Sequence, residues 1–433
     1  MFRRVLADHF LRSETEVSHV TFVVLLLMLW LVLAVALLVA RHGRLLHELW
    51  REPMIERPVL IVESDDWGPG PAEDARILRE ITGILARIRD RDGHPAVMTL
   101  GVVLGIPDAA AILASGGAEY TRRTLAETEF TPVVDAIRGG CVAGVFALQR
   151  HGLEHFWPQV LIARLREDDA LRAWLGDPLM RSETLPAEIQ SRWVDAARLP
   201  SRALPSDDIE RAVREETELF RRIFGEAPEV AVPNTFVWDE TVERAWAASG
   251  VRCVVTPGCR FEQRREGGGL AAATRRIRNG QRGAGGMTYV VRNDYFEPIR
   301  GHRAERVWQA VARRSAQARP TLLETHRESF IDGPDRVRMA LEELESALRG
   351  AQSRHPDLCF MSTAELARHL ADPASRLLAR RLPVRIRVWL CRLRAELASA
   401  RLLKATGLML PLRATEWGLG ILTRQRVVRL DQT

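Results

Sequence analysis

The strongest pattern of hydrophobic positions is an uninterrupted apolar run near the N-terminus. Residues Val20–Ala40 carry no charge over 21 positions, which matches the roughly 20 residues that a helix needs to cross a bilayer. A cleaved signal peptide is the alternative, but its apolar core spans only about 7 to 15 residues, and Arg41-His42-Gly43-Arg44 stand where a small-residue cleavage site belongs. We therefore expect an uncleaved transmembrane helix.

From Val59 onward, short apolar runs alternate with longer segments in which apolar residues recur at helical spacing. This alternation is typical of repeated β-α units and a largely parallel sheet. The predicted strands are Val59–Glu63, Ala96–Val102, Cys141–Leu148, Val230–Pro233, Val251–Thr256, Thr288–Arg292, Thr321–Thr325 and Leu358–Met361. The predicted helices are Ala72–Arg91, Pro158–Arg166, Ile209–Phe224, Asp239–Ser249, Ala304–Gln317, Pro334–Leu348 and Thr363–Leu370. Strands at this spacing predict an α/β fold with a closed or nearly closed β/α barrel.

Two segments interrupt the alternation, residues 168–208 and 260–286, and we interpret both as surface insertions. A basic amphipathic helix is predicted from Pro383 to a stop near Gly407. Two interpretations of this tail stay open, namely a helix on an anionic bilayer surface and a helix packed on the barrel. The predicted organisation is 1–19 N-terminal flank, 20–40 transmembrane helix, 41–57 linker, 58–371 barrel and 372–433 helical tail.

Composition and charge narrow the functional classes. The 433 residues include 62 Lys and Arg against 56 Asp and Glu, a net charge of +6. Because acidic residues are interleaved with the arginines through most of the chain, we do not expect nucleic-acid binding. The five cysteines form no CxxC pair or regular disulfide framework.

Arginines flank the apolar run almost equally on both sides, so the sequence does not predict which side of the membrane bears the barrel. It also predicts no oligomeric state.

Carboxylates and imidazoles follow the ends of the predicted strands. Asp65 and Asp66 come just after the first strand. An adjacent pair of carboxylates in this place can supply one metal ligand and one base. The alternative is that one carboxylate caps the N-terminus of a helix and its neighbour is solvated. His151 and His155 follow the third strand, and their spacing predicts one face of a helical turn, within reach of one ion. Two His nitrogens and one Asp oxygen would leave open positions on the metal, as in hydrolytic centres. His326 ends a later strand and is a candidate general acid, with a structural histidine as the alternative.

These motifs resemble those of the polysaccharide deacetylases of the NodB-homology type, carbohydrate esterase family four. ESDDWG at Glu63–Gly68 resembles the Asp-Asp motif of that family, and His151–His155 resembles its HxxxH motif. VPNTFVWD at Val232–Asp239 resembles the third motif, and the strand ending at His326 resembles the last. The order and rough spacing agree over Pro58–Leu370. The resemblance implies a distorted (β/α) barrel of 7–8 strands and metal-dependent hydrolysis of an acetyl group on a glycan.

Carried over by position, the resemblance also implies a role for each residue. The implied ligands of the metal, commonly Zn²⁺, are Asp66, His151 and His155. Asp65 would be the base and His326 would protonate the leaving amine. A backbone N–H near Asn234-Thr235 would face the oxyanion.

Two positions depart from the family pattern. Trp67 stands where the family usually has glycine, so we include it among the possible substrate contacts. The arginine that usually opens the third motif is absent, and Arg292, from another strand end, is a candidate to supply its charge; a surface arginine on a turn is the alternative.

The leading hypothesis is a membrane-anchored deacetylase of the cell membrane, whose partners are an acetylated polysaccharide or lipid-linked glycan and the bilayer, with a possible contact between the tail and anionic lipid. One alternative is a hydrolase of another C–N bond, such as a cyclic amide. A second alternative is a non-catalytic glycan-binding or assembly component that keeps the barrel.

Overall fold

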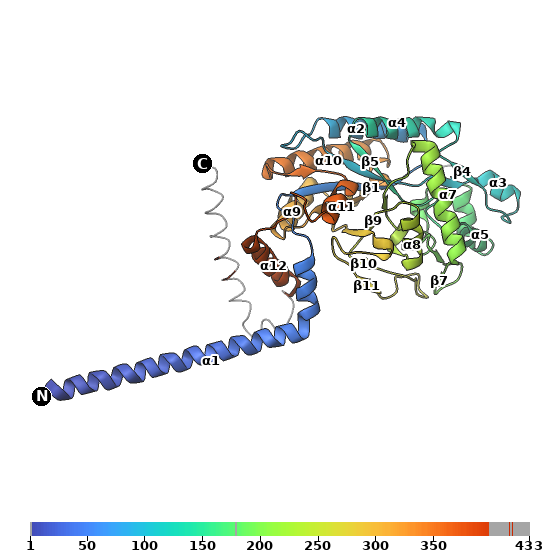
Figure 1. The fold of residues 1–433 in the computed structure, drawn as a ribbon. Coiled ribbons are helices and arrows are strands. Elements are labelled where there is room, and N and C mark those ends of the chain that lie inside the picture. The colour runs from blue at the N-terminus through green and yellow to red at the C-terminus, as the bar shows by residue number, and fades with distance from the viewer. Residues whose placement is uncertain (1, 178–179, 398–414, 416–417, 419–433) are drawn as a thin grey trace. The chain divides into compact units, whose positions relative to one another are not determined.

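The computed structural model of the chain describes residues 2–177, 180–397, 415 and 418. Its elements group into two units, residues 1–51 with 380–433 and residues 52–379 (Figure 1). The predicted helix stop at Gly407, and the rest of the predicted tail apart from the two isolated positions, lie outside the described residues.

Parallel strands form the centre of the second unit. One nine-stranded sheet has the order β12-β9-β8-β5-β2-β1-β14-β13, and β15 pairs with β1 off this path. The strands are β1 (Val59–Trp67), β2 (Met98–Val102), β5 (Phe146–Arg150), β8 (Val230–Ala231), β9 (Cys253–Thr256), β12 (Thr288–Val291), β13 (Asp294–Tyr295), β14 (Thr321–His326) and β15 (Cys359–Phe360). All eight predicted strands are therefore present, although the third begins only at Phe146 and β13 was not predicted.

The two ends of this sheet meet, because β12 and β13 are parts of one short run of chain. β12 pairs with β9, whereas β13 pairs with β14. Between them, the Arg292 N–H donates to Thr256 O at 2.9 Å and the Asn293 N–H donates to Leu322 O at 3.2 Å. The run thus changes partner within two residues and closes the ring, which confirms the predicted 7–8-stranded barrel.

Side chains of β1 alternate between two buried layers, as the period of two along a strand requires. Leu60 and Val62 join the core that the outer helices cover. Val59 and Ile61 join a cluster with residues of β8, β9, β12, β14 and β15, which is the barrel interior. Both faces of β1 are therefore buried, as in other sheets covered by crossover helices.

Helices surround the barrel, and all of them except the helix over residues 131–142 were predicted from the sequence (Figure 1). They are α2 (Ala72–Ala86), α4 (Thr131–Val142), α5 (Pro158–Leu165), α7 (Ser206–Phe224), α8 (Glu240–Ala248), α9 (Ala304–Ala316), α10 (Pro334–Arg354) and α11 (Thr363–Ala371). Several boundaries were wrong: α2 ends at Ala86 and not at Arg91, α10 continues past Leu348 to Arg354, and Cys141 and Val142 end α4 instead of starting a strand. Gly144, with φ 71°, turns the chain before β5 begins at Phe146.

The insertions carry small elements of their own. Residues 168–208 contain α6 (Asp169–Leu175) and the pair β6 (Val194–Asp195) and β7 (Arg202–Ala203). The second insertion overlaps the pair β10 (Cys259–Arg260) and β11 (Arg275–Arg276). A further hairpin, β3 (Gly105–Pro107) and β4 (Arg122–Thr124), follows β2.

The first unit contains α1 (Phe2–Arg51), interrupted by a non-helical residue at His42, and α12 (Leu382–Leu397). Within α1, Thr21–Arg51 is long and apolar enough to cross a membrane, a test that a signal sequence would also pass. α12 begins one residue before its predicted start. The predicted linker from residue 41 is helical as far as Arg51.

Candidate metal centre

Asp65 and Asp66 both face the barrel interior because β1 is irregular at this point. Alternation along the strand places Asp65 on the interior face with Ile61 and Glu63. The pairing of β1 with β2 then shifts between Ser64 and Trp67, which marks a bulge, and Asp66 has φ 71°. A bulge re-aims side chains locally, so two consecutive carboxylates reach the same end of the barrel.

Asp66, His151 and His155 converge tightly enough to hold one ion. Asp66 Oδ1 lies 3.2 Å from His151 Nε2 and 3.1 Å from His155 Nε2, and the two Nε2 atoms are 3.1 Å apart. The potential ligand atoms of the three residues lie within 4.8 Å of one another. All three residues are buried, with 6%, 3% and 4% of their surface exposed.

The donor chemistry of this cluster fits a divalent cation. His151 Nδ1 lies 3.1 Å from Val232 O, to which it donates in the neutral ring, so that Nε2 keeps its lone pair for a metal. Asp66 Oδ1 is buried without a hydrogen bond among the described residues. Burial raises the pKa of Asp66, but His155 and His151 outweigh it and hold the pKa well below its usual value. Three electron-pair donors facing one another in a buried space are what a metal site requires.

The two histidines converge without the predicted helical turn, so that expectation was wrong. Residues 153–156 form a bend, the residues on either side have no regular structure, and α5 starts only at Pro158. Gly152 has φ 97°, and a Cβ there would lie 2.5 Å from Glu154 O. Asn234 Nδ2 also donates to His151 O at 2.8 Å, which supports this tight loop. Glycine and proline around the motif were the signal for a loop.

Arg292 holds Asp65 in place. Its Nη1 donates to Asp65 Oδ2 at 2.6 Å, and its Nε donates to Glu63 Oε2 at 2.7 Å. Gln149 Nε2 donates to Asp65 Oδ1 at 3.2 Å. Burial raises the pKa of Asp65, but the charge and hydrogen bond of Arg292 together with the charges of His151 and His326 outweigh burial, so the pKa is lowered. The structure therefore places a cation beside Asp65 from the closing segment of the ring.

His326 ends β14 beside Asp65, its register partner on β1. His326 Nδ1 lies 2.5 Å from Glu297 Oε1, and Ser329 Oγ donates to Glu297 Oε2 at 2.6 Å. Burial lowers the pKa of His326, but the hydrogen bond to Glu297 and the nearby carboxylates raise it to about 10. The imidazole is thus charged at neutral pH, as a proton donor must be.

Three carboxylates near the site were missed in the sequence. Glu297 holds His326, and Glu324 Oε1 lies 3.6 Å from His326 Nε2. The spacing of Glu324 and His326 by two residues in one strand was a usable signal, because such residues share a face. Glu183 comes from the insertion 168–208, and burial followed by the Asp66 charge raises its pKa. No local pattern marks Glu183, since its position depends on how the insertion folds.

The remaining predicted residues lie in supporting positions. Asn234 is fully buried against His151, and Thr235 Oγ1 lies 2.7 Å from Ser191 Oγ. Trp67 is fully buried in the outer core and its Nε1 donates to Ser64 Oγ at 2.9 Å. A side chain in this position packs the barrel wall and is closed to a substrate.

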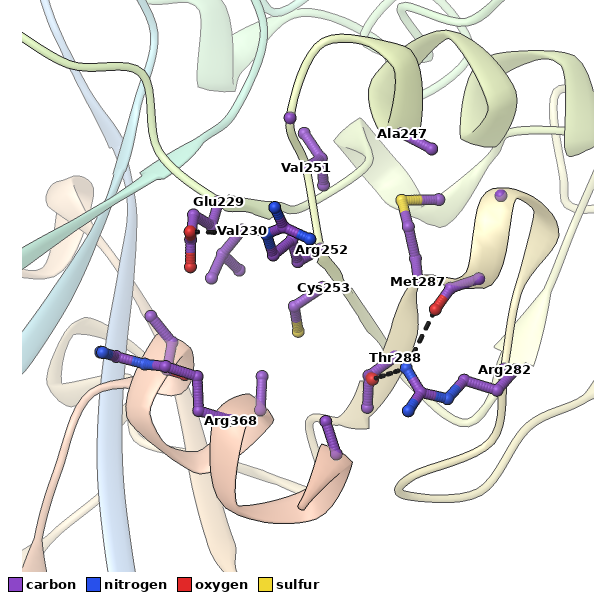
Figure 2. A pocket seen from close by; sticks show the side chains of 16 residues that line it. Glu229, Val230, Ala247, Val251, Arg252, Cys253, Arg282, Met287, Thr288 and Arg368 are labelled. Atoms are coloured by element: carbon purple, nitrogen blue, oxygen red, sulfur yellow. Dashed lines mark hydrogen bonds and ion pairs between the residues drawn. The ribbon is translucent and has the colours of Figure 1, made fainter.

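Two pockets lie at different ends of the strands, and neither is lined by Asp65, Asp66, His151, His155 or His326. One of about 530 Å³ is lined by Gly70, Asp74, Phe130 and Arg327, next to His326 in the chain. Another of about 260 Å³ lies where β8, β9 and β12 begin, lined by residues such as Val230, Cys253 and Thr288 (Figure 2). The cluster of Asp66, His151 and His155 lies at the carboxyl ends of the strands, the end where barrel enzymes place their catalytic groups.

No family model and no curated protein matches the chain. Among solved structures it is similar to the 4-alpha-glucanotransferase from Thermococcus litoralis, at 11% identity and a TM-score of 0.40; the match covers 81% of this chain but 48% of that one. It is also similar to the chitin deacetylase from the fungal pathogen Colletotrichum lindemuthianum, at 12% identity and a TM-score of 0.35, covering 76% and 94% of the two chains. A family 4 carbohydrate esterase from Streptomyces lividans matches at 10% identity and a TM-score of 0.32, covering 76% and 100%. The family that the sequence motifs resemble is thus represented among these structures.

Proposed function

We propose that this protein is a membrane-anchored, metal-dependent hydrolase that removes acetyl groups from a polysaccharide or a lipid-linked glycan. The observation that carries the proposal is the convergence of Asp66, His151 and His155 beside an Asp65–Arg292 pair and a charged His326. Acyl hydrolysis needs these components together, namely an electrophilic cation, a base and an acid.

The metal proposed for this site is Zn²⁺, held by Asp66, His151 and His155. Three protein ligands of nitrogen and oxygen leave a position open for substrate or water. When bound, such an ion supplies Lewis acidity toward an acyl carbonyl.

The protein's own groups move the protons. Asp65 accepts a proton from the attacking water, and Arg292 keeps its carboxylate charged and correctly oriented. His326 donates from Nε2 to the leaving nitrogen, while Glu297 holds Nδ1 and stabilises the charged ring. A backbone N–H near Asn234-Thr235 faces the oxyanion and stabilises charge that develops in the transition state.

The apolar part of α1 anchors the protein in the cell membrane under this proposal. Leu46 O accepts a hydrogen bond from Trp389 Nε1 of α12 at 3.0 Å, and Ala34 and Leu38 are buried in one cluster with Leu393. Cleavage after the apolar run would separate Ala34 and Leu38 from Leu393, which favours a retained anchor over a signal peptide.

The test is acetate release from acetylated oligosaccharides by the full chain in detergent. Asp65→Asn should lower the rate about 100-fold or more, the range measured for general bases. The control is Asp335→Asn, an exposed carboxylate on α10 paired with Arg338, which should leave the rate unchanged. Full activity of Asp65→Asn, or activity that survives removal of divalent metal by a chelator, would refute the proposal.

A second candidate, hydrolysis of a smaller amide, is favoured by one observation. The site is largely closed, with 2% of Asp65 exposed and 27% of the His326 side chain exposed. A glycan chain needs an open groove, whereas a small amide fits a closed cavity. Parallel assays with acetylated oligosaccharides and small cyclic or acylated amides would separate the two.

A further inference from the structure

We propose that the helical unit formed by α1 and α12 binds the headgroups of anionic phospholipids. This inference rests on the membrane anchoring proposed above and names the lipid partner of that anchor. Three observations support it: the distribution of positive charge between the two units, the packing of α12 along α1, and the types of side chain at the border of the apolar run.

Positive charge is concentrated in the helical unit. Residues 1–51 and 380–433 contain 18 Lys and Arg against 7 Asp and Glu, a net charge of +11. Residues 52–379 contain 44 against 49, a net charge of −5. The overall net charge of +6 is therefore the sum of one positively charged unit and one negatively charged unit. An anionic bilayer attracts the first and repels the second.

α12 runs antiparallel to the second part of α1 and ends beside the apolar run. Near its start, Arg385 Nη2 donates to Trp50 O at 3.0 Å. One turn later, Trp389 Nε1 donates to Leu46 O at 3.0 Å. Near its end, Leu393 and Leu397 share a buried cluster with Ala34 and Leu38. Because Ala34 and Leu38 belong to the last two turns of the uncharged segment, the end of α12 lies at the depth of the membrane border.

The side chains at this border are of the types that are enriched at membrane–water interfaces. The rings of Trp50 and Trp389 pack edge to face with centroids 6.3 Å apart, and the Arg385 guanidinium lies 5.0 Å from the centroid of Trp50. Tryptophan is enriched at the headgroup level of membrane proteins. Arginine can reach lipid phosphate while its stem stays on apolar surface.

The cations of this region outnumber its anions by far. Between residues 41–51 and 380–397 the only acidic residues are Glu48, which pairs with Arg44 at 3.0 Å, and Glu396. The basic residues of the same two segments are Arg41, Arg44, Arg51, Arg380, Arg381, Arg385, Arg387, Arg392 and Arg394. Arg392 is fully buried, and the other eight match the clusters of four to eight basic residues beside a membrane segment that bind anionic lipid.

Hydrogen exchange of the full chain in lipid nanodiscs tests the inference. Nanodiscs of phosphatidylcholine alone are compared with nanodiscs that contain phosphatidylglycerol. Amides of 380–397 should exchange about fivefold more slowly with the anionic lipid, the effect of roughly one arginine held at the surface. High salt should abolish the difference, because it screens surface charge.

Matched variants make the test specific. Arg380→Gln, Arg381→Gln and Arg387→Gln together should remove the lipid effect, whereas Arg336→Gln, Arg338→Gln and Arg349→Gln on α10 remove equal charge and should preserve it. Exchange of the barrel amides reports whether each variant is folded.

Equal exchange in both lipids, an effect that persists in high salt, or an equal loss in the α10 variant would overturn the inference. Acetate release in the same nanodiscs is a separate readout, so failure of the deacetylase proposal and failure of lipid binding are distinguishable.

Discussion

Gly101 of β2 is the position where a single methyl group should disable the site. An ideal Cβ on Gly101 would lie 2.3 Å from Asp65 Oδ1 and 3.0 Å from Asp65 Cγ. Ordinary contacts of a Cβ begin near 3.4 Å, so Gly101→Ala must move the carboxylate by about 1 Å. Arg292 and Gln149 hold that carboxylate through hydrogen bonds of 2.6 Å and 3.2 Å, so the displacement breaks the arrangement that orients the base.

The expected losses follow from this displacement. A misplacement of about 1 Å at a reacting group costs about 100-fold in rate. Overpacking a rigid core by one methyl group costs about 1 to 3 kcal/mol, which lowers the melting temperature by roughly 1 to 2 °C per kcal/mol in a domain of this size. Activity should therefore fall far more than stability.

Acetate release and thermal unfolding of the full chain measure the two effects. The control is Gly139→Ala in α4, where a Cβ would have no neighbour within 4 Å and a helical alanine should stabilise by about 0.4 to 1 kcal/mol. If Gly101→Ala keeps full activity with an unchanged melting temperature, the placement of Asp65 against β2 is wrong.

Three further predictions concern the charged groups of the site. His326 has a pKa of about 10 in the fold against 6.5 when unfolded, so its stabilising effect is complete below pH 6.5 and disappears as the pH rises through 10. His326→Gln should remove this part of the stability profile between pH 6 and 10 in melting experiments, and an unchanged profile would contradict the Glu297 interaction. Arg292→Met leaves Glu63 and Asp65 buried without their cation and should cost about 3 to 5 kcal/mol; Arg292→Lys should be less severe, and denaturant unfolding that ranks the two equally would argue against the pairing. Asp66→Asn removes one ligand, so the purified protein should lose most of its bound metal by elemental analysis, while the exposed control Asp135→Asn keeps it.

The sequence predicted those parts of the fold that depend on local pattern. The apolar strands, the helical periods and the strand-end positions of Asp65, His151 and His326 were all visible along the chain. Each of these features involves residues that are close in sequence, where periodicity and turn chemistry apply.

The remaining features depend on contacts between distant segments. Arg292 and Glu63 are 229 positions apart, and only the closed ring brings them together. The bulge that turns Asp66 inward arises from the pairing of β1 with β2, which no property of ESDDWG specifies. Glu183 reaches the site from an insertion whose path is set by tertiary packing.

The run of chain that switches partners from β9 to β14 determines from which strand the cation beside Asp65 comes. A closed ring of strands has no first or last strand around its axis. A guanidinium can therefore pair with the same carboxylate from different strands of the ring. Here the segment that completes the circle carries Arg292 at the switch itself. A cation sought by its order along the chain near Asp65 would be missed, whereas one sought by its angle around the axis would be found at Arg292.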